Sequence, residues 1–196
     1  MKVSHCLLVD DRTGGLAISS SILFSKGIIS HPVERDVTVK AVFQGLDKLK
    51  SAEKLLPDVP AIVLGGEGFI GSELVRGGGK KFHSFDVGLG KSFSVLFERL
   101  RDRPIIVLNV TKKGALASYI PYLWPEAVLV NEVYPEPTEK ELQRLKETGA
   151  TCYHIVGPRG KAWPGFQRGY AGGIPFCTSF WPEDGGRGYE VLVKKL

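Results

Sequence analysis

Short apolar runs alternate with amphipathic segments between residues 61 and 156 of this chain. The runs are only four to six residues long, and the three at 61–64, 105–108 and 127–130 are entirely apolar. Runs of this length and composition are typical of strands that are buried on both faces. Strands are predicted at 61–64, 81–86, 105–108, 127–130 and 151–156.

Helices are predicted between these strands from apolar residues repeated at helical spacing. The sequence favours helices at 92–100 and 115–123, and a third that starts at Thr138 and runs through Lys146. Thr138 and Glu141 have the spacing of a capping box, and Gly149 is placed to end this helix. Strands that alternate with helices predict an α/β fold with a doubly wound, mostly parallel sheet and right-handed crossovers.

The flanking regions divide the chain into three expected parts. Residues 1–60 read as a small α/β segment, with strands at 3–9 and 27–30, an apolar run at 16–24 and a connecting helix at 37–49. Residues 61–157 form the alternating domain. Residues 158–196 are rich in aromatic side chains and glycine, which is typical of a lid or of a subunit interface.

A glycine-rich loop follows the first strand of the alternating domain. It reads Gly66-Glu-Gly68-Phe69-Ile70-Gly71, the strand–turn–helix pattern of a dinucleotide-binding unit. In this pattern Gly66 permits a sharp turn, Gly68 lets the backbone approach a pyrophosphate, and Gly71 lets the helix pack closely. The amides around Phe69 and Ile70 then belong to a helix N-terminus, which favours phosphate. These five residues are therefore expected to bind a cofactor.

Asp86 strengthens this expectation, because it lies 20 residues after Gly66 and ends the second predicted strand. An acid at this place accepts hydrogen bonds from the adenosine ribose. Its charge disfavours a 2′-phosphate, so we expect NAD or NADP as the cofactor, with NAD favoured. Lys80, Lys81 and Lys91 lie nearby in sequence and soften this preference.

Further polar residues stand where later strands end, which is where a doubly wound sheet binds its ligand. Asn109 and Thr111 follow the third strand, and Asn131 follows the fourth. All three are expected to contact the ribose, the nicotinamide or its carboxamide.

Three residues are candidates for catalysis. Glu132 can act as a general base if burial raises its pKa, or it can simply cap a loop. His154 can supply a proton, although a histidine inside a strand is more often a buried, hydrogen-bonded residue. Lys161 can bind a substrate carboxylate.

Asp10, Asp11 and Arg12 form a charged cluster at the end of the first predicted strand. This cluster can bind the amino or carboxylate group of a substrate. The alternative is a solvated turn with a local ion pair.

Residues 63–75 resemble the opening of the extended short-chain dehydrogenases. That family catalyses with a Tyr-x-x-x-Lys pair, which this sequence lacks: Tyr189 and Lys194 are five residues apart. The order of a substrate-binding segment, a connecting helix and a Rossmann domain instead resembles the shikimate dehydrogenase and amino-acid dehydrogenase-like group. Asn109-Val110-Thr111 is similar to that group's Asn-Thr-Thr turn near the nicotinamide.

The strand, the Asp-Asp-Arg turn and the helix ahead of the glycine loop are also similar to the last enzyme of pyrrolysine biosynthesis. These resemblances imply an NAD(P)-dependent oxidoreductase that acts on a small polar metabolite, with amino or imino acids as candidates. Two alternatives stay open. One is a nucleotide-binding sensor or scaffold without catalysis, and the other is a non-redox enzyme that uses bound NAD.

Composition narrows the classes of partner. The 196 residues carry a net charge of +5, with lysines and arginines mixed among acids, so no nucleic-acid partner is expected. No apolar run is long enough to cross a membrane. The three scattered cysteines favour reduced thiols in the cytoplasm, and no spacing suggests a metal site. The expected partners are a small-molecule substrate and a further copy of the chain in a homo-oligomer.

Overall fold

A computed structural model describes most of the alternating domain and parts of the flanking regions. The described residues are 7–9, 16–18, 31–86, 98–133, 137–159, 161–163 and 190–196. The chain forms two compact units, and each combines segments that are distant in sequence. The first unit contains residues 1–47 and 155–193, and the second contains residues 48–154 and 194–196.

The first unit contains a three-stranded antiparallel sheet. Strand β1 (Leu7–Val9) lies between β2 (Leu16–Ile18) and β8 (Lys161–Trp163). A strand was expected at 3–9, and β2 lies within the apolar run noted at 16–24, for which no strand was predicted. The strand expected at 27–30 lies outside the described residues.

Helix α2 (His31–Ala52) is longer at both ends than the helix predicted at 37–49. Pro32 is its second residue, and a proline is tolerated in the first turn, where an amide has no helical partner. The apolar stripe of the sequence therefore identified the middle of the helix but not its beginning.

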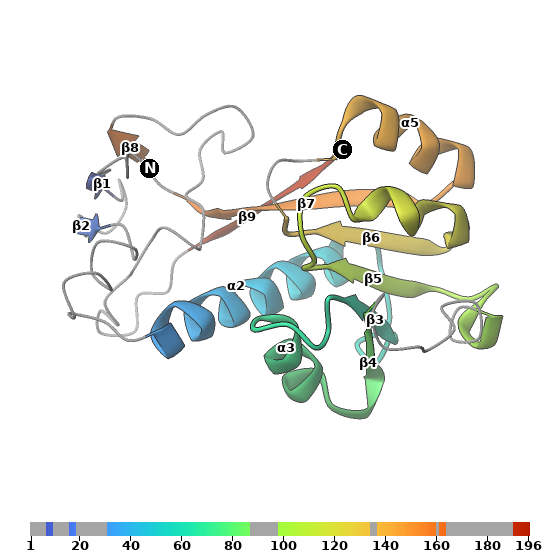
Figure 1. Cartoon of the computed structure of the whole chain (residues 1–196), viewed down its shortest axis with the longest axis horizontal. Helices are drawn as coiled ribbons and strands as arrows, with labels where there is room; N and C mark the ends of the chain where they lie inside the picture. Colours follow the sequence, from blue (N-terminus) through green and yellow to red (C-terminus); the bar gives the residue numbers. More distant parts are fainter. Residues whose placement is uncertain are drawn as a thin grey trace. The chain divides into compact units, whose positions relative to one another are not determined.

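A six-stranded sheet contains the five strands predicted between residues 61 and 156 (Figure 1). Its order is β4-β3-β5-β6-β7-β9, and the first five strands pair in parallel. Strand β9 runs antiparallel to β7, because Leu196 donates to the Cys152 carbonyl while Arg159 donates to that of Glu190. The strands are β3 (Ala61–Leu64), β4 (Phe82–Phe85), β5 (Ile105–Asn109), β6 (Ala127–Asn131), β7 (Thr151–Pro158) and β9 (Val191–Lys195).

The second unit carries two α-helices that begin after strand ends. Helix α3 (Gly71–Gly78) follows the glycine-rich loop and leads through a 3-10 turn, η1 (Gly79–Lys81), into β4. Helix α5 (Glu139–Thr148) begins with the predicted capping box of Thr138 and Glu141. It ends at Gly149, whose φ of 76° is left-handed.

The α-helix predicted at 115–123 is wrong. This region forms two 3-10 helices, η2 (Leu116–Ser118) and η3 (Ile120–Tyr122). Pro121 explains the difference, because it has no N–H to donate to a carbonyl one α-helical turn earlier. Of the helix predicted at 92–100, the described residues 98–100 are helical.

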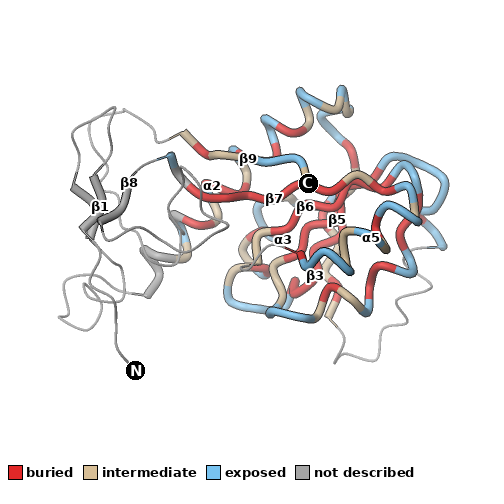
Figure 2. Tube along the Cα trace, turned by 90° about the horizontal axis from the view of Figure 1, so that it is seen from above, coloured by how far each residue is buried: buried red, intermediate tan, exposed pale blue. Residues whose placement is uncertain are grey.

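The core of the second unit lies on the sheet face that η2, η3 and α5 cover. Alternate strand residues such as Ile62, Val107 and Leu129 pack there with Trp124 and Leu145. Every residue of β3, β5 and β6 is buried, as expected of parallel strands covered on both faces (Figure 2). The α/β class with a mostly parallel sheet, predicted from the alternating pattern, is thus confirmed.

Within the described segments, no helix has both the length and the apolar composition needed to span a membrane.

Candidate functional site

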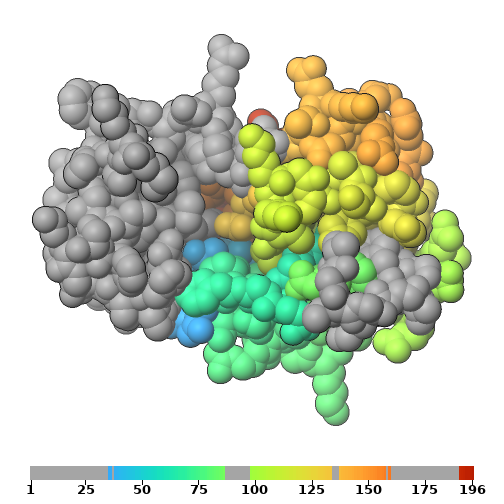
Figure 3. Space-filling model, viewed as in Figure 1, coloured from blue at the N-terminus to red at the C-terminus, as the bar shows by residue number. Residues whose placement is uncertain are grey.

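The direction of the chain across the sheet reverses at β3 of the second unit. The chain leaves β3 for β4 on one side and then crosses back to β5 on the other side. In a doubly wound sheet, the loops that leave such a pair of strands in opposite directions leave a crevice at their carboxyl ends. The glycine-rich loop follows β3, and Val110 and Thr111 follow β5. Figure 3 shows the loop and α3 (turquoise to green) next to the segment after β5 (yellow-green).

The glycines of this loop are required by close packing. Gly65 has a φ of 85°, so it makes the turn predicted for Gly66. A Cβ on Gly66 would lie 2.6 Å from the Ser84 hydroxyl of β4. A Cβ on Gly71 would lie 1.9 Å from the Gly65 carbonyl oxygen. Helix α3 can therefore approach the turn only because residue 71 has no side chain, as the motif predicts.

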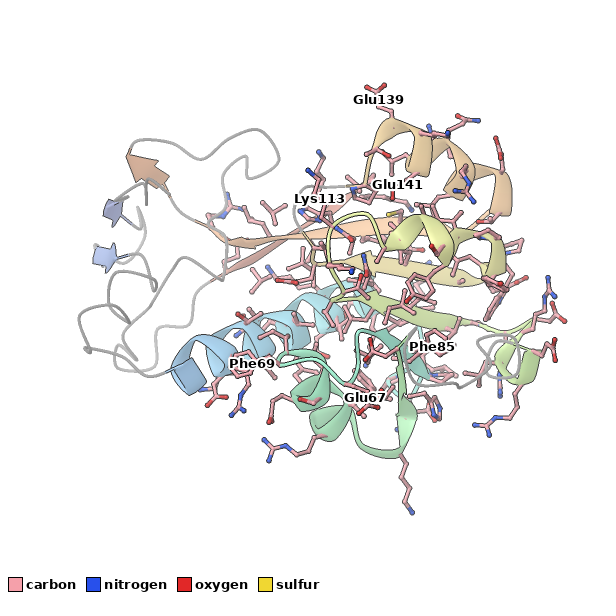
Figure 4. All side chains as sticks on the ribbon, in the orientation of Figure 1. Glu67, Phe69, Phe85, Lys113, Glu139 and Glu141 are labelled. Carbon is pink, nitrogen blue, oxygen red and sulfur yellow. The ribbon has the colours of Figure 1, made fainter. Side chains whose placement is uncertain are left out.

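Gly68 differs from these neighbours because it is exposed. A Cβ there would meet only the Gly65 oxygen, at 3.1 Å. The first bond of helical type runs from the Ser72 amide to the Gly68 carbonyl (2.9 Å), so the amides of residues 69–71 precede it. Phe69 lies in the same loop and is 47% exposed (Figure 4). The N-terminus of α3 thus presents backbone amides beside a position without a side chain.

Asp86 follows β4 and bonds directly to the loop. Its Oδ2 accepts from the Glu67 amide at 2.7 Å, and the Glu67 carboxylate accepts from the Ser84 hydroxyl at 2.5 Å. The predicted acid therefore lies beside the glycine turn. Glu67 is a second carboxylate there that was not predicted, although its place inside the motif is visible in the sequence.

Asn109, Asn131 and His154 form one row across three strands. Register pairs Asn109 of β5 with Asn131 of β6, and Asn131 with His154 of β7. The Asn109 amide nitrogen donates to the Asn131 side-chain oxygen at 2.7 Å, and the Asn131 nitrogen lies 3.0 Å from His154 Nδ1. The Thr111 hydroxyl donates to the Asn109 side-chain oxygen at 2.6 Å. Four predicted site residues are thus joined in one network.

Three side chains of this network are buried, which limits the contacts they can make with a ligand. Asn109, Asn131 and His154 are each at most 2% exposed. The Asn131 nitrogen also donates to the Val133 carbonyl at 2.7 Å, so its other hydrogen points to His154 Nδ1, which accepts. This arrangement favours the alternative stated for His154, a buried and hydrogen-bonded histidine that fixes the strand ends.

Glu132 follows β6 directly, and its amide donates to the Asn109 carbonyl at 3.0 Å. Burial raises the pKa of its carboxyl to about 7. A carboxyl with this pKa exists in both protonation states near neutral pH, which suits proton transfer. The expectation that burial perturbs Glu132 therefore agrees with its surroundings.

A pocket of about 340 Å³ lies between the segment after β5 and the start of α5. Its floor includes Asn109 and Asn131 of the buried row. Four cationic side chains line it, and the lining acid is Glu141 of the capping box. Figure 4 shows Lys113 and Glu141 at this place. The cations are Lys112, Lys113, Lys140 and Arg144.

None of these four cations was predicted as a site residue from the sequence. Lys112 and Lys113 come just after the polar end of β5, and Lys140 and Arg144 are four residues apart on α5. This spacing places the second pair on one side of the helix. The two pairs are close only because the fold brings α5 beside the end of β5.

The remaining predicted site residues lie in the first unit. Lys161 belongs to β8 and is paired with Val9 of β1. Asp10, Asp11 and Arg12 lie outside the described residues. In the described part of the chain, no three histidine, cysteine, aspartate or glutamate side chains lie together in a way that could hold a metal ion.

Comparison with models of known families and with curated protein sequences found no match for this chain.

Proposed function

We propose that this protein is an NAD(P)-dependent oxidoreductase with a Rossmann-like nucleotide site in its second unit. The observation that carries the proposal is the glycine turn at the switch point, with the Asp86 carboxylate at the end of the adjacent strand. Nucleotides bind at this place in doubly wound folds because backbone amides and the helix N-terminus attract phosphate.

The residues present fit a dinucleotide in its expected orientation. The amides of residues 69–71 would hold the pyrophosphate, and Asp86 would accept from the adenosine ribose hydroxyls. The carboxylates of Glu67 and Asp86 both accept hydrogen bonds between the glycine loop and the end of β4, and they would repel a 2′-phosphate, which favours NAD. Thr111 and the ends of β5 and β6 would face the nicotinamide half.

The bound nucleotide would supply hydride transfer, and the chain would supply the accompanying proton. Glu132 is the candidate for this proton, because its carboxyl has a pKa of about 7 and it adjoins the end of β5. Asn109 and Asn131 would act as positioning residues, since their side chains are bonded to each other. A small polar metabolite, with amino and imino acids tested first, is the proposed substrate.

Nucleotide binding is tested by titrating the full chain with NADH and NADPH while following tryptophan fluorescence and thermal unfolding. We expect both to bind, NADH more tightly. Gly68→Ala should weaken NADH binding about tenfold, or about 1.4 kcal/mol, because its Cβ would occupy the place of approach. The variant's unfolding temperature without nucleotide is the control for folding. Absence of any shift with either nucleotide would refute the proposal.

A second candidate function is nucleotide binding without catalysis. Two observations favour it: His154 is buried, and Asn109, Asn131 and Thr111 are hydrogen-bonded to one another, as in a protein that binds a nucleotide without chemistry. Such a sensor or scaffold would bind NADH but would not oxidise it with any metabolite of a broad panel. Turnover without net oxidation or reduction of the nucleotide would instead indicate a non-redox enzyme.

A further inference from the structure

The pocket between β5 and α5 has a charge that the nucleotide proposal does not explain. Four cationic side chains help to line its volume of about 340 Å³, and the carboxylate of Glu141, the one acid of its described lining, accepts from Thr138 in the capping box. Among the residues that the structure describes, Lys112, Lys113, Lys140 and Arg144 form no ion pair. Clustered cations repel one another, so an anion bound near them is attracted by each of them.

The shape of the pocket selects the size of the ligand. Its volume lies at the small end of the range for small-molecule sites. The guanidinium of Arg144 can hold two oxygens of one anionic group, and the lysines act as point charges. Asn109 and Asn131 close the floor with uncharged amide groups, so the cations define the character of the site.

We infer that this pocket binds a small metabolite with at least two negative charges. The binding of a dianion rests on the pocket alone. Its assignment as the substrate of the proposed oxidoreductase rests on the proposed function. The ends of β5 and β6 form both the pocket floor and the expected nicotinamide edge, so a dianion there would lie next to the reacting part of the nucleotide.

The test uses the full chain and two probes, malonate for dicarboxylates and inorganic phosphate for phosphate compounds. Each is titrated to about 10 mM, which saturates a site with a Kd near 1 mM, while thermal unfolding and amide NMR shifts are followed. We expect at least one probe to bind, and added salt to weaken it. The probe that binds more tightly identifies the class of anion.

Lys112→Gln and Arg144→Gln should each weaken this binding about tenfold or more, since each removes a charged partner. Lys146→Gln is the matched control, because Lys146 is exposed on the same helix and does not line the pocket. No binding by either probe, or equal weakening by the control, would overturn the anion site.

Failure of the nucleotide proposal can be distinguished from failure of the anion-site proposal. If NADH does not bind but the probe does, the anion site stands and the oxidoreductase does not. If both bind, NADH should leave the probe in place, and displacement of the probe by NADH would overturn the assignment of the pocket to the substrate.

Discussion

Glu132 is the residue whose surroundings most change its chemistry. Burial raises the pKa of its carboxyl from 4.5 to about 7, so the folded state holds a proton more tightly than the unfolded state. The fold is then favoured below pH 4.5, and this advantage is lost as pH rises to about 7. Glu132→Gln should remove this pH dependence of the free energy of unfolding, stabilising the protein by about 3 kcal/mol at pH 8 relative to wild type.

The measurement is urea unfolding at pH values between 5 and 8, within the interval over which the carboxyl titrates. Glu126→Gln, at an exposed position just ahead of β6, is the control and should leave the pH profile parallel to wild type. A Glu132→Gln profile that keeps the wild-type slope would show that the carboxyl titrates alike in both states.

Single residues were predictable where a strand ends in a polar side chain. Asn109, Asn131 and His154 each stand out against apolar neighbours, and this contrast is local in the sequence. Their common row was not predictable, because register between parallel strands depends on the packing of whole strands. Lys140 and Arg144 were missed for the same reason, since their pocket needs a helix and a distant loop.

At the scale of elements, the glycine turn and α3 form one packed piece. A Cβ at Gly71 would lie 1.9 Å from backbone oxygen, whereas one at Gly68 would lie 3.1 Å from the same atom. Gly71→Ala must therefore displace the helix, and we expect a loss of about 1–3 kcal/mol in the free energy of unfolding. Gly68→Ala should lose clearly less.

Urea unfolding of the two variants, each without nucleotide, compares their free energies of unfolding. The substitution is the same in both, and the two positions are three residues apart. Equal losses would mean that α3 does not pack against the turn as described. The outcome does not depend on any ligand, so it tests the loop's architecture separately from its proposed role.

Elements with local determinants were predicted well. The capping box of Thr138 and the left-handed Gly149 fix the ends of α5 through neighbours within a few residues. Apolar spacing alone misled at 115–123, because it ignored the backbone donor that Pro121 lacks. The strands at 161–163 and 191–195 were not predicted, since their partners lie far away in sequence.

At the scale of the molecule, both units are closed by segments that are distant in the sequence. Residues 194–196 belong to the second unit, whose other residues end at His154. Leu196 packs against its core and donates to the Cys152 carbonyl at 2.9 Å. Lys195 pairs with Glu53 at 3.0 Å, and Glu53 also accepts from the Tyr153 hydroxyl.

Deletion of residues 194–196 should therefore destabilise the second unit by about 2 kcal/mol, mostly through lost apolar burial and to a smaller degree through the partly exposed ion pair. Hydrogen exchange should become faster at Cys152 and the neighbouring amides of β7.

The hydrogen bond from Tyr153 and the charge of Lys195 lower the pKa of the Glu53 carboxyl below 4.5. The ion-pair part of the loss should thus be present above about pH 4.5 and disappear as pH falls further. The Lys195→Gln variant isolates the ion-pair contribution to stability. If hydrogen exchange at Cys152 stays unchanged after the deletion, the second unit is complete without residues 194–196.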